Sequence, residues 1–165
     1  MPELAAGLHL RVATPEDLGA LEALDRRVWD DQSSPTGSVS GAAFGAGRAF
    51  EDTWVAVRVG RVLGFVTIGR RTQLASNRHV AVVRVLAVAP ECRGEGLGLA
   101  LLQRAKEEAR RRGYRKLSLT VLGSNGPALR LYQRVGFVIE GRLRGEFELG
   151  GRLVDDVLLG CALDP

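Results

Sequence analysis

The sequence has 165 residues, 45% hydrophobic and 25% charged, which is the size and composition of one globular domain with its own core. No apolar run approaches the roughly 20 residues that cross a bilayer, and the amino terminus lacks the basic and apolar stretches of a secretory signal, so we expect a cytoplasmic protein without membrane contact. The net charge of +4 comes from scattered arginines, many beside acidic residues, which favours a small phosphate-bearing ligand over nucleic acid.

The first third of the chain predicts a strand, a helix and a long loop. Residues 8–13 alternate apolar and polar side chains, as in a short strand. Thr14-Pro15 supplies an N-cap and a proline at the first helical position, so a helix is expected to about Val28. The loop within residues 29–50 is rich in Ser, Gly and Pro, with only a short helix expected at 39–44. We expect this loop to be poorly ordered without an acceptor substrate and to act as a lid.

Three β-type runs follow. Residues 53–59 and 62–69 are joined at Gly60-Arg61, which is a hairpin signal, and residues 79–88 form a third run with few polar positions. We therefore expect three neighbouring antiparallel strands in the middle of the sheet.

The second half predicts a long helix, a strand, a short helix and a long hairpin. A stripe of small and apolar residues at i, i+3 and i+4 spacing marks the helix at 97–112, and Gly113 ends it. Pro127 begins the short helix, and Gly150-Gly151 turns the hairpin. The stripe consists of Gly98, Leu101, Leu102, Ala105 and Ala109, and the last four elements span 114–122, 126–135, 136–149 and 152–163.

The predicted order βα(α)βββαβαββ indicates an α/β fold of the mixed α+β kind. We expect a mostly antiparallel central sheet of about seven strands flanked by about four helices. No repeat and no linker divides the sequence, so residues 1–165 are expected to form a single domain.

A glycine-rich loop connects the strand that ends at Val88 to the long helix. It contains Arg93, Gly94, Gly96 and Gly98. Such a loop presents unpaired backbone N–H groups and a helix dipole to phosphate groups. The ligand is therefore expected to carry phosphate.

Two common phosphate-binding motifs do not fit this loop. The dinucleotide fingerprint G-x-G-x-x-G needs a glycine at its sixth position, where the frames from Gly94 and Gly96 place Leu99 and Leu101. A Walker A loop would end in Gly-Lys-Ser/Thr, whereas this loop ends in Gly98-Leu99-Ala100. Hydrolysis of nucleoside triphosphates is not expected.

The loop instead has the pattern R-x-x-G-x-G over Arg93–Gly98, which resembles the pyrophosphate-binding motif of the GNAT superfamily of N-acetyltransferases. A second segment, Ser124–Phe137, resembles that family's N-x-x-A-x-x-L-Y-x-x-x-G-F pattern. The predicted element order also matches the family fold, so the resemblance covers essentially the whole chain. The residues in register in the second segment are Asn125, Ala128, Leu131, Tyr132, Gly136 and Phe137.

The resemblance implies a cosubstrate, acetyl-CoA, and a role for each matching residue. Asn125 would hydrogen-bond the pantetheine arm, and Tyr132 would protonate the departing CoA thiolate as a general acid. The strand backbone at Leu86, Ala87 and Val88 would pair with the pantetheine, and one N–H there would polarise the thioester carbonyl. The pyrophosphate would be bound by Arg93 and by the amides of Gly94, Glu95, Gly96, Leu97 and Gly98, where glycine would allow close backbone approach.

The residues leave simpler interpretations open. The glycine cluster is also compatible with a tight turn, and Asn125 with a turn or cap residue. Tyr132 shares a helical stripe with apolar neighbours, as a core tyrosine would. Glu95 is interpreted as a solvated loop charge rather than a catalytic group.

The general base is where the chain departs from the family. Many relatives carry a glutamate on the strand before the loop, but Val82 and Arg84 stand at the comparable places. His79, at the start of that strand, is a candidate base that would act directly or through water. Acidic residues flanking the long loop are candidates for attracting a cationic amine, or simply face solvent: Asp30, Asp31, Glu51 and Asp52. The base is left unassigned among these.

Two functions of different class follow from the resemblance. The first is an enzyme that transfers acetyl from acetyl-CoA to a primary amine by direct attack in a ternary complex, the acceptor being a protein N-terminus, a polyamine or a small amine. The second is a CoA-binding sensor or scaffold without catalysis, which the missing glutamate keeps open. No metal is expected, since Cys92 and Cys161 have no zinc-binding spacing, and a homodimer is left open.

Overall fold

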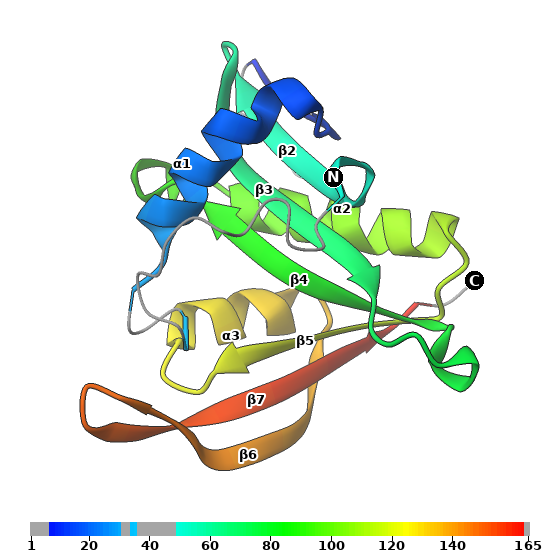
Figure 1. The fold of residues 1–165 in the computed structure, drawn as a ribbon, viewed down its shortest axis with the longest axis vertical. Coiled ribbons are helices and arrows are strands. Elements are labelled where there is room, and N and C mark those ends of the chain that lie inside the picture. Colours follow the sequence, from blue (N-terminus) through cyan, green and yellow to red (C-terminus); the bar gives the residue numbers. More distant parts are fainter. Residues whose placement is uncertain (1–6, 31–33, 36–48, 164–165) are drawn as a thin grey trace.

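One mixed sheet of seven strands organises the chain, in the spatial order β1-β2-β3-β4-β5-β7-β6 (Figure 1). The computed structural model describes residues 7–30, 34–35 and 49–163. The predicted strands and both predicted hairpins are confirmed. The strands are β1 Leu8–Val12, β2 Thr53–Arg58, β3 Arg61–Arg70, β4 Val80–Val88, β5 Lys116–Leu122, β6 Val138–Leu149 and β7 Arg152–Ala162.

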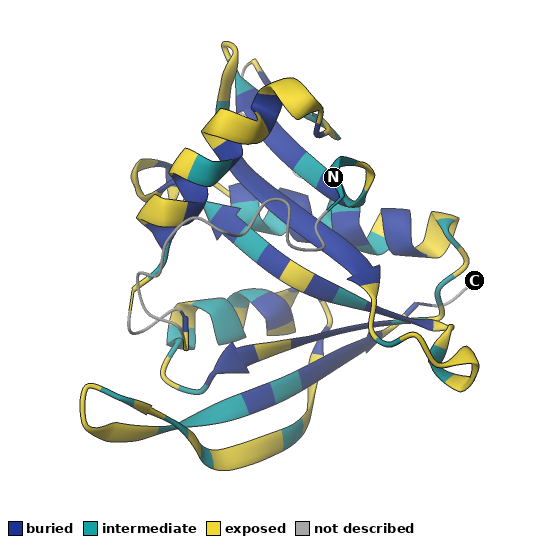
Figure 2. Ribbon diagram, viewed as in Figure 1, coloured by how far each residue is buried: buried dark blue, intermediate teal, exposed yellow. Residues whose placement is uncertain are grey.

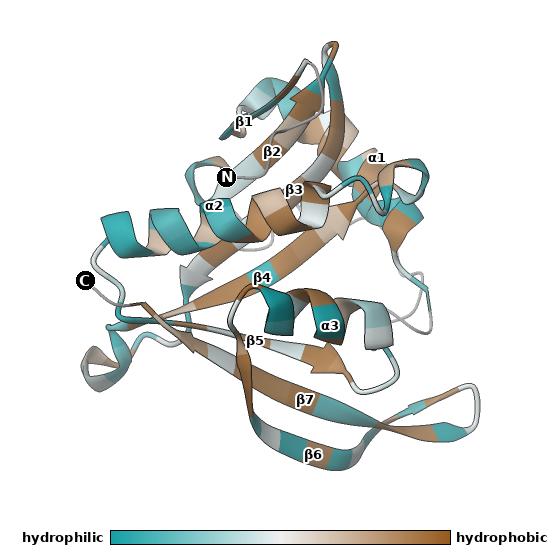
Figure 3. Ribbon diagram, turned by 180° about the vertical axis from the view of Figure 1, so that it is seen from behind, coloured by the Kyte–Doolittle hydropathy of each residue, from teal (hydrophilic) through white to brown (hydrophobic). Residues whose placement is uncertain are grey.

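Helices cover both faces of this sheet. α1 (Leu18–Val28) lies on one face and α2 (Leu97–Arg111) on the other, with α3 (Gly126–Arg134) beside α2 (Figures 1 and 3). The described residues therefore contain three α-helices rather than the expected four or so, together with short 3-10 turns. The short helix expected at 39–44, and most of the loop expected to act as a lid, lie outside the described residues.

The start of α1 is capped as expected, but through a 3-10 turn. Thr14 and Asp17 form a capping box around Pro15–Asp17, and α1 continues from Leu18. Asp17 also accepts two hydrogen bonds from the guanidinium of Arg11, at 2.6 and 2.8 Å. These contacts fix α1 against the first strand.

The core lies between the helices and the central strands (Figure 2). β2 to β5 are buried over most of their length, whereas β6, at the sheet edge, is largely exposed. α2 is apolar in its first turns and strongly polar in its last (Figure 3), and its predicted stripe is buried at Leu101, Leu102, Ala105 and Ala109. No helix within the described ranges is long and apolar enough to cross a membrane.

Two irregularities in the sheet shape its centre. β4 and β5 form the parallel pair of the sheet, and their register ends at Val82↔Ser118, although both strands continue beyond it. On the other side of β4, the register with β3 passes from Thr67↔Val85 to Ile68↔Val83, which leaves Arg84 as the extra residue of a β-bulge. The two strands β4 and β5 therefore separate in the middle of an otherwise antiparallel sheet.

Candidate active site

A cavity of about 1220 Å³ opens where β4 and β5 separate. The unpaired part of each strand forms its walls, at residues 83–88 and 119–122. The glycine-rich loop also lines it, and α1 and α3 contribute residues from either face of the sheet. Segments far apart in the sequence thus meet around one space: Asp25, Trp29, residues 92–99, Asn125, Tyr132, Phe147 and Asp156 all line it.

The glycine-rich loop has the backbone expected of an anion-binding loop. Gly94 and Gly96 have φ angles of +86° and +83°, in the left-handed region, and a Cβ at either would meet no protein atom within 4 Å. Gly96 is the N-cap of α2, so the N–H groups of the first helical turn have no acceptor within the helix. The loop therefore offers open space and N–H donors beside the cavity, as a phosphate group requires.

Two details of the loop differ from the sequence-based expectation. At Gly98 a Cβ would lie 3.0 Å from Cδ2 of Leu131, so glycine there allows α2 to pack closely against α3. The backbone N–H of Glu95 donates to the carbonyl of Cys92 at 3.4 Å and is engaged in the turn before the helix. The N–H donors left free for an anion are consequently those of the first turn of α2, beginning at Leu97.

Three contacts fix this loop to the rest of the fold. Arg93 donates from Nη2 to the Val28 carbonyl at the end of α1, at 3.3 Å. Glu95 pairs with Arg58 of β2 at 2.8 Å, and Glu91 pairs with Arg27 of α1 at 2.8 Å. Glu95 is therefore an anchoring charge, and Arg93 reaches the cavity from the loop.

Tyr132 lies on α3 with its side chain against both the core and the cavity. It is 9% exposed, lines the cavity, and packs edge-on against Phe137 with ring centroids 6.0 Å apart. Burial raises the pKa of its hydroxyl to about 12, so the phenol stays protonated at neutral pH. The ring is thus a core residue that also lines the cavity, and its role as a general acid stays a prediction.

Asn125 caps α3 and also lines the cavity. Its Oδ1 accepts a hydrogen bond from the backbone N–H of Ala128 at 3.2 Å. The side-chain amide N–H₂ group takes no part in the cap and is a donor suited to a ligand carbonyl.

His79 is not brought to the cavity. It is exposed and precedes β4 at the end where that strand is paired with β5, away from the lining residues 83–88. Its backbone carbonyl accepts hydrogen bonds from Arg115 and Lys116. His79 therefore lies at the end where β4 and β5 are paired. Its position does not support the hypothesis that it acts as the base.

The acidic residues suggested as amine-attracting groups are also separated. Asp52 pairs with Arg112 at the far end of α2, and Asp31 lies outside the described residues. Asp30 lines the cavity, whereas Glu51 is not among its lining residues. Arg84, at the position where relatives often carry glutamate, lines the cavity and donates from Nη2 to the Arg70 carbonyl at 2.9 Å.

Sequence reasoning missed two carboxylates that line the cavity. Asp25, on α1, accepts a hydrogen bond from Nε1 of Trp29, just after the helix, at 2.8 Å, and the four-residue spacing between them was the available signal. Asp156 lies on β7, and burial raises the pKa of its carboxyl above the ordinary value. The sequence around Asp156 has the pattern of an ordinary edge hairpin, and nothing in that pattern indicates that Asp156 borders a cavity.

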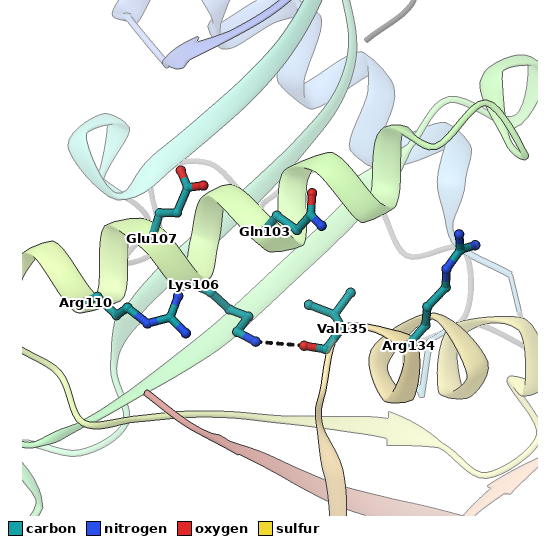
Figure 4. A pocket seen from close by; sticks show the side chains of 6 residues that line it. All are labelled: Gln103, Lys106, Glu107, Arg110, Arg134 and Val135. Atoms are coloured by element: carbon teal, nitrogen blue, oxygen red, sulfur yellow. Dashed lines mark hydrogen bonds between the residues drawn. The ribbon is translucent and has the colours of Figure 1, made fainter. Parts of the chain in front are cut away.

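A second, smaller pocket of about 260 Å³ lies between α2 and the end of α3 (Figure 4). Lys106 donates from Nζ to the Val135 carbonyl at 2.8 Å, which ties the two helices together. The remaining lining residues are Gln103, Glu107, Arg110 and Arg134. This pocket is therefore a polar space beside a contact that holds α2 and α3 together.

Comparison with known proteins agrees with the geometry. Residues 18–137 match the model of the Acetyltransferase (GNAT) family. The chain is 31% identical over 106 residues to the L-methionine sulfoximine/L-methionine sulfone acetyltransferase of Pseudomonas aeruginosa, covering 64% of this chain and 61% of that protein. It is 37% identical over 90 residues to the streptothricin acetyltransferase of Streptomyces lavendulae, covering 54% of this chain and 46% of that protein.

Among solved structures, smu.2055 from Streptococcus mutans superposes with a TM-score of 0.83 at 25% identity, covering 94% of this chain and 99% of that chain. The matches to the two curated relatives thus span less than two thirds of those proteins, whereas the fold matches over nearly its full length. With the family model matching well over half of the residues, the chain belongs to the Acetyltransferase (GNAT) family.

Proposed function

We propose that this protein is an acetyl-CoA-dependent N-acetyltransferase that transfers an acetyl group to a primary amine by direct attack in a ternary complex. One observation carries the proposal. Tyr132, whose hydroxyl pKa burial raises to about 12, lines the same cavity as the glycine-rich loop before α2.

The residues of the cavity fit acetyl-CoA. Beyond Val82 the edge of β4 toward β5 is unpaired, so the backbone at Leu86, Ala87 and Val88 can pair with the amides of the pantetheine arm. The open backbone at Gly94 and Gly96 and the first-turn amides of α2 suit the pyrophosphate, assisted by Arg93. Asn125 would donate its side-chain amide to the pantetheine between these two ends.

Acetyl-CoA supplies the thioester as acyl donor, and the chain supplies orientation and a proton. A backbone N–H of β4 would hydrogen-bond the thioester carbonyl and stabilise the charge that develops on its oxygen. Tyr132 would donate its hydroxyl proton to the sulfur as the C–S bond breaks. Because its pKa is raised to about 12, the proton is present throughout the neutral range.

The acceptor side of the cavity favours a cation. Carboxylates of Asp25, Asp30 and Asp156 line it. Of the three arginines that also line the cavity, Arg93 belongs to the loop before α2, Arg134 to the end of α3, and Arg84 donates to the Arg70 carbonyl. The two curated relatives are named for amine-bearing small molecules, which supports a small amine before a polyamine or a protein N-terminus.

Release of the CoA thiol from acetyl-CoA tests the proposal, with L-methionine sulfoximine, streptothricin, spermidine and an alanine-amino-terminal peptide as acceptors. We expect amine-dependent release with at least one of them. A sensor or scaffold would bind acetyl-CoA in calorimetry and release no thiol above the rate without amine, and that result would overturn the proposal.

A further inference from the structure

Asp156 differs from its neighbour Asp155 in where its side chain points. Successive side chains of a strand face opposite ways, and Asp155 accepts hydrogen bonds from the Gly145 N–H at 2.9 Å and from Arg142 at 3.5 Å. Asp156 lines the cavity instead, on a backbone paired with Leu122 at the end of β5. β7, the strand next to β5 in the sheet, thus carries a carboxylate to the opening between β4 and β5.

Three other carboxylates line the cavity, and each is engaged elsewhere. Asp25 accepts the indole N–H of Trp29, and Glu95 pairs with Arg58 away from the acceptor side. Asp30 also has an interaction with the protein. Among the described residues no lysine, arginine or histidine forms an ion pair with Asp156, which makes its carboxylate available to a cation from outside.

The surroundings of Asp156 also suit proton uptake. Burial raises the pKa of its carboxyl, the nearby charge of Glu146 on β6 adds to the effect, and a backbone hydrogen bond from Val157 opposes it. The other ionisable groups that line the cavity outside residues 92–99 are Arg84 from β4, Asp25 from α1, Asp30 after α1, and Tyr132 and Arg134 from α3. By contrast, the Gly145 N–H and Arg142 lower the pKa of Asp155.

We propose that Asp156 is the general base for the acceptor amine, the role for which no carboxylate is present on β4. This inference rests on the proposed function. The ammonium group gives one proton to the Asp156 carboxylate, and the neutral nitrogen then attacks the thioester carbon, so that the C–N bond forms and the C–S bond breaks. Tyr132 gives its proton to the thiolate and regains one from the new amide nitrogen, while the proton on Asp156 passes to solvent.

The test compares Asp156→Asn with the matched control Asp155→Asn, using the panel amine that the wild type acetylates fastest. We expect Asp156→Asn to lower kcat/KM for the amine by about 10²-fold or more at pH 7, as for a lost general base. Its acetyl-CoA affinity in calorimetry should stay within about twofold of wild type. Asp155→Asn should keep both the affinity and the rate, even if its thermal midpoint falls.

The pH profile separates a base from a residue that only shapes the cavity. In Asp156→Asn only amine that is already neutral can react, so kcat/KM should rise about tenfold per pH unit up to the amine's own pKa. The wild type should instead level off above the pKa of Asp156. Glu146→Gln should lower the pH at which the rate levels off, because it removes a like charge near Asp156. Asp156→Glu should recover part of the rate that Asp156→Asn loses.

A readout independent of turnover is the carboxyl ¹³C titration of aspartate-labelled protein, with Asp156→Asn assigning the signal. We expect the Asp156 signal to titrate above the ordinary aspartate range in wild type and lower in Glu146→Gln. An ordinary or lowered pKa, or an Asp156→Asn enzyme with the rate and pH profile of wild type, would overturn the inference. If no amine is acetylated by wild type, the proposed function fails, and the titration still decides whether Asp156 is poised to take a proton.

Discussion

Val82 of β4 and Ser118 of β5 are the last residues through which these two parallel strands pair. Beyond them both strands continue, and their unpaired segments form opposite walls of the cavity. The start of α2, Tyr132 of α3 and Asp156 of β7 all line this cavity as well. Substitution of single residues can therefore separate the contribution of each group.

Replacement of Tyr132 by Phe should lower turnover by about 10²-fold or more, as expected for a lost general acid. The ring would keep its packing against Phe137, so the free energy of unfolding should change little. Acetyl-CoA affinity should change much less than turnover, because the proton is transferred in the transition state. Steady-state kinetics and calorimetry measure the two effects. Equal turnover for Phe and Tyr, with acetyl transfer rate-limiting, would reduce Tyr132 to a core residue.

Wild-type turnover should show no loss from ionisation of Tyr132 between pH 7 and pH 10. The reason is that burial holds the pKa of this hydroxyl at about 12, above that of an exposed tyrosine. A rate profile measured in overlapping buffers up to pH 10 checks this. A fall in rate toward pH 10 that is present in wild type and absent in Tyr132→Phe would show that the phenol ionises at a lower pH than expected.

Gly96→Val should weaken acetyl-CoA binding by more than its backbone strain explains. The control is Gly113→Val, because Gly113 has a similar φ of +80° and, as at Gly96, a Cβ there would meet no protein atom within 4 Å. Each change should cost about 1–2 kcal/mol of stability, the usual cost of a left-handed non-glycine residue. Only Gly96→Val places a side chain beside the amides that we propose bind the pyrophosphate. Equal acetyl-CoA affinity for the two variants would contradict the loop assignment.

Glu108 should stabilise the fold in a pH-dependent way. Its buried carboxylate accepts hydrogen bonds from Arg111 and Arg112 at 2.7–2.8 Å, which lowers its pKa to about 2. Since the folded-state pKa is below the unfolded value, the stabilisation is complete above about pH 4.5 and is lost as the pH falls toward 2.

Glu108→Gln should therefore cost about 2 kcal/mol at pH 7, and the difference from wild type should shrink as the pH approaches 2. Glu107→Gln is the matched control, because Glu107 is exposed and forms a surface pair with Arg104 worth about 0–1 kcal/mol. Denaturant unfolding at several pH values measures both. A Glu108→Gln penalty that is independent of pH would show that the carboxylate charge is not what stabilises the helix.

Local patterns in the sequence predicted most of the fold. The α2 stripe, the capping residues before α1 and the glycine turns at residues 60 and 150–151 each lie where short-range chemistry decides the structure. The glycine-rich loop was found for the same reason, since its positive φ angles and N-cap are local features.

The acceptor side could not be predicted, because it depends on pairing between distant strands. The end of the β4–β5 register decides that Arg84 borders the cavity and that His79 does not. Asp156 reaches the cavity only because β7 inserts between β5 and β6 in the sheet. Similarly, the reason for Gly98 is its contact with Leu131, on a different helix, which no local pattern shows.

The most direct test of the central claim is the fate of the acetyl group of ¹³C-acetyl-CoA, followed by mass spectrometry with the same amine panel. We expect label on the nitrogen of at least one amine, one CoA thiol released for each acetylated amine, and no label on the protein. Acetyl-CoA binding without any labelled amine, or label retained on the protein as a covalent intermediate, would contradict it.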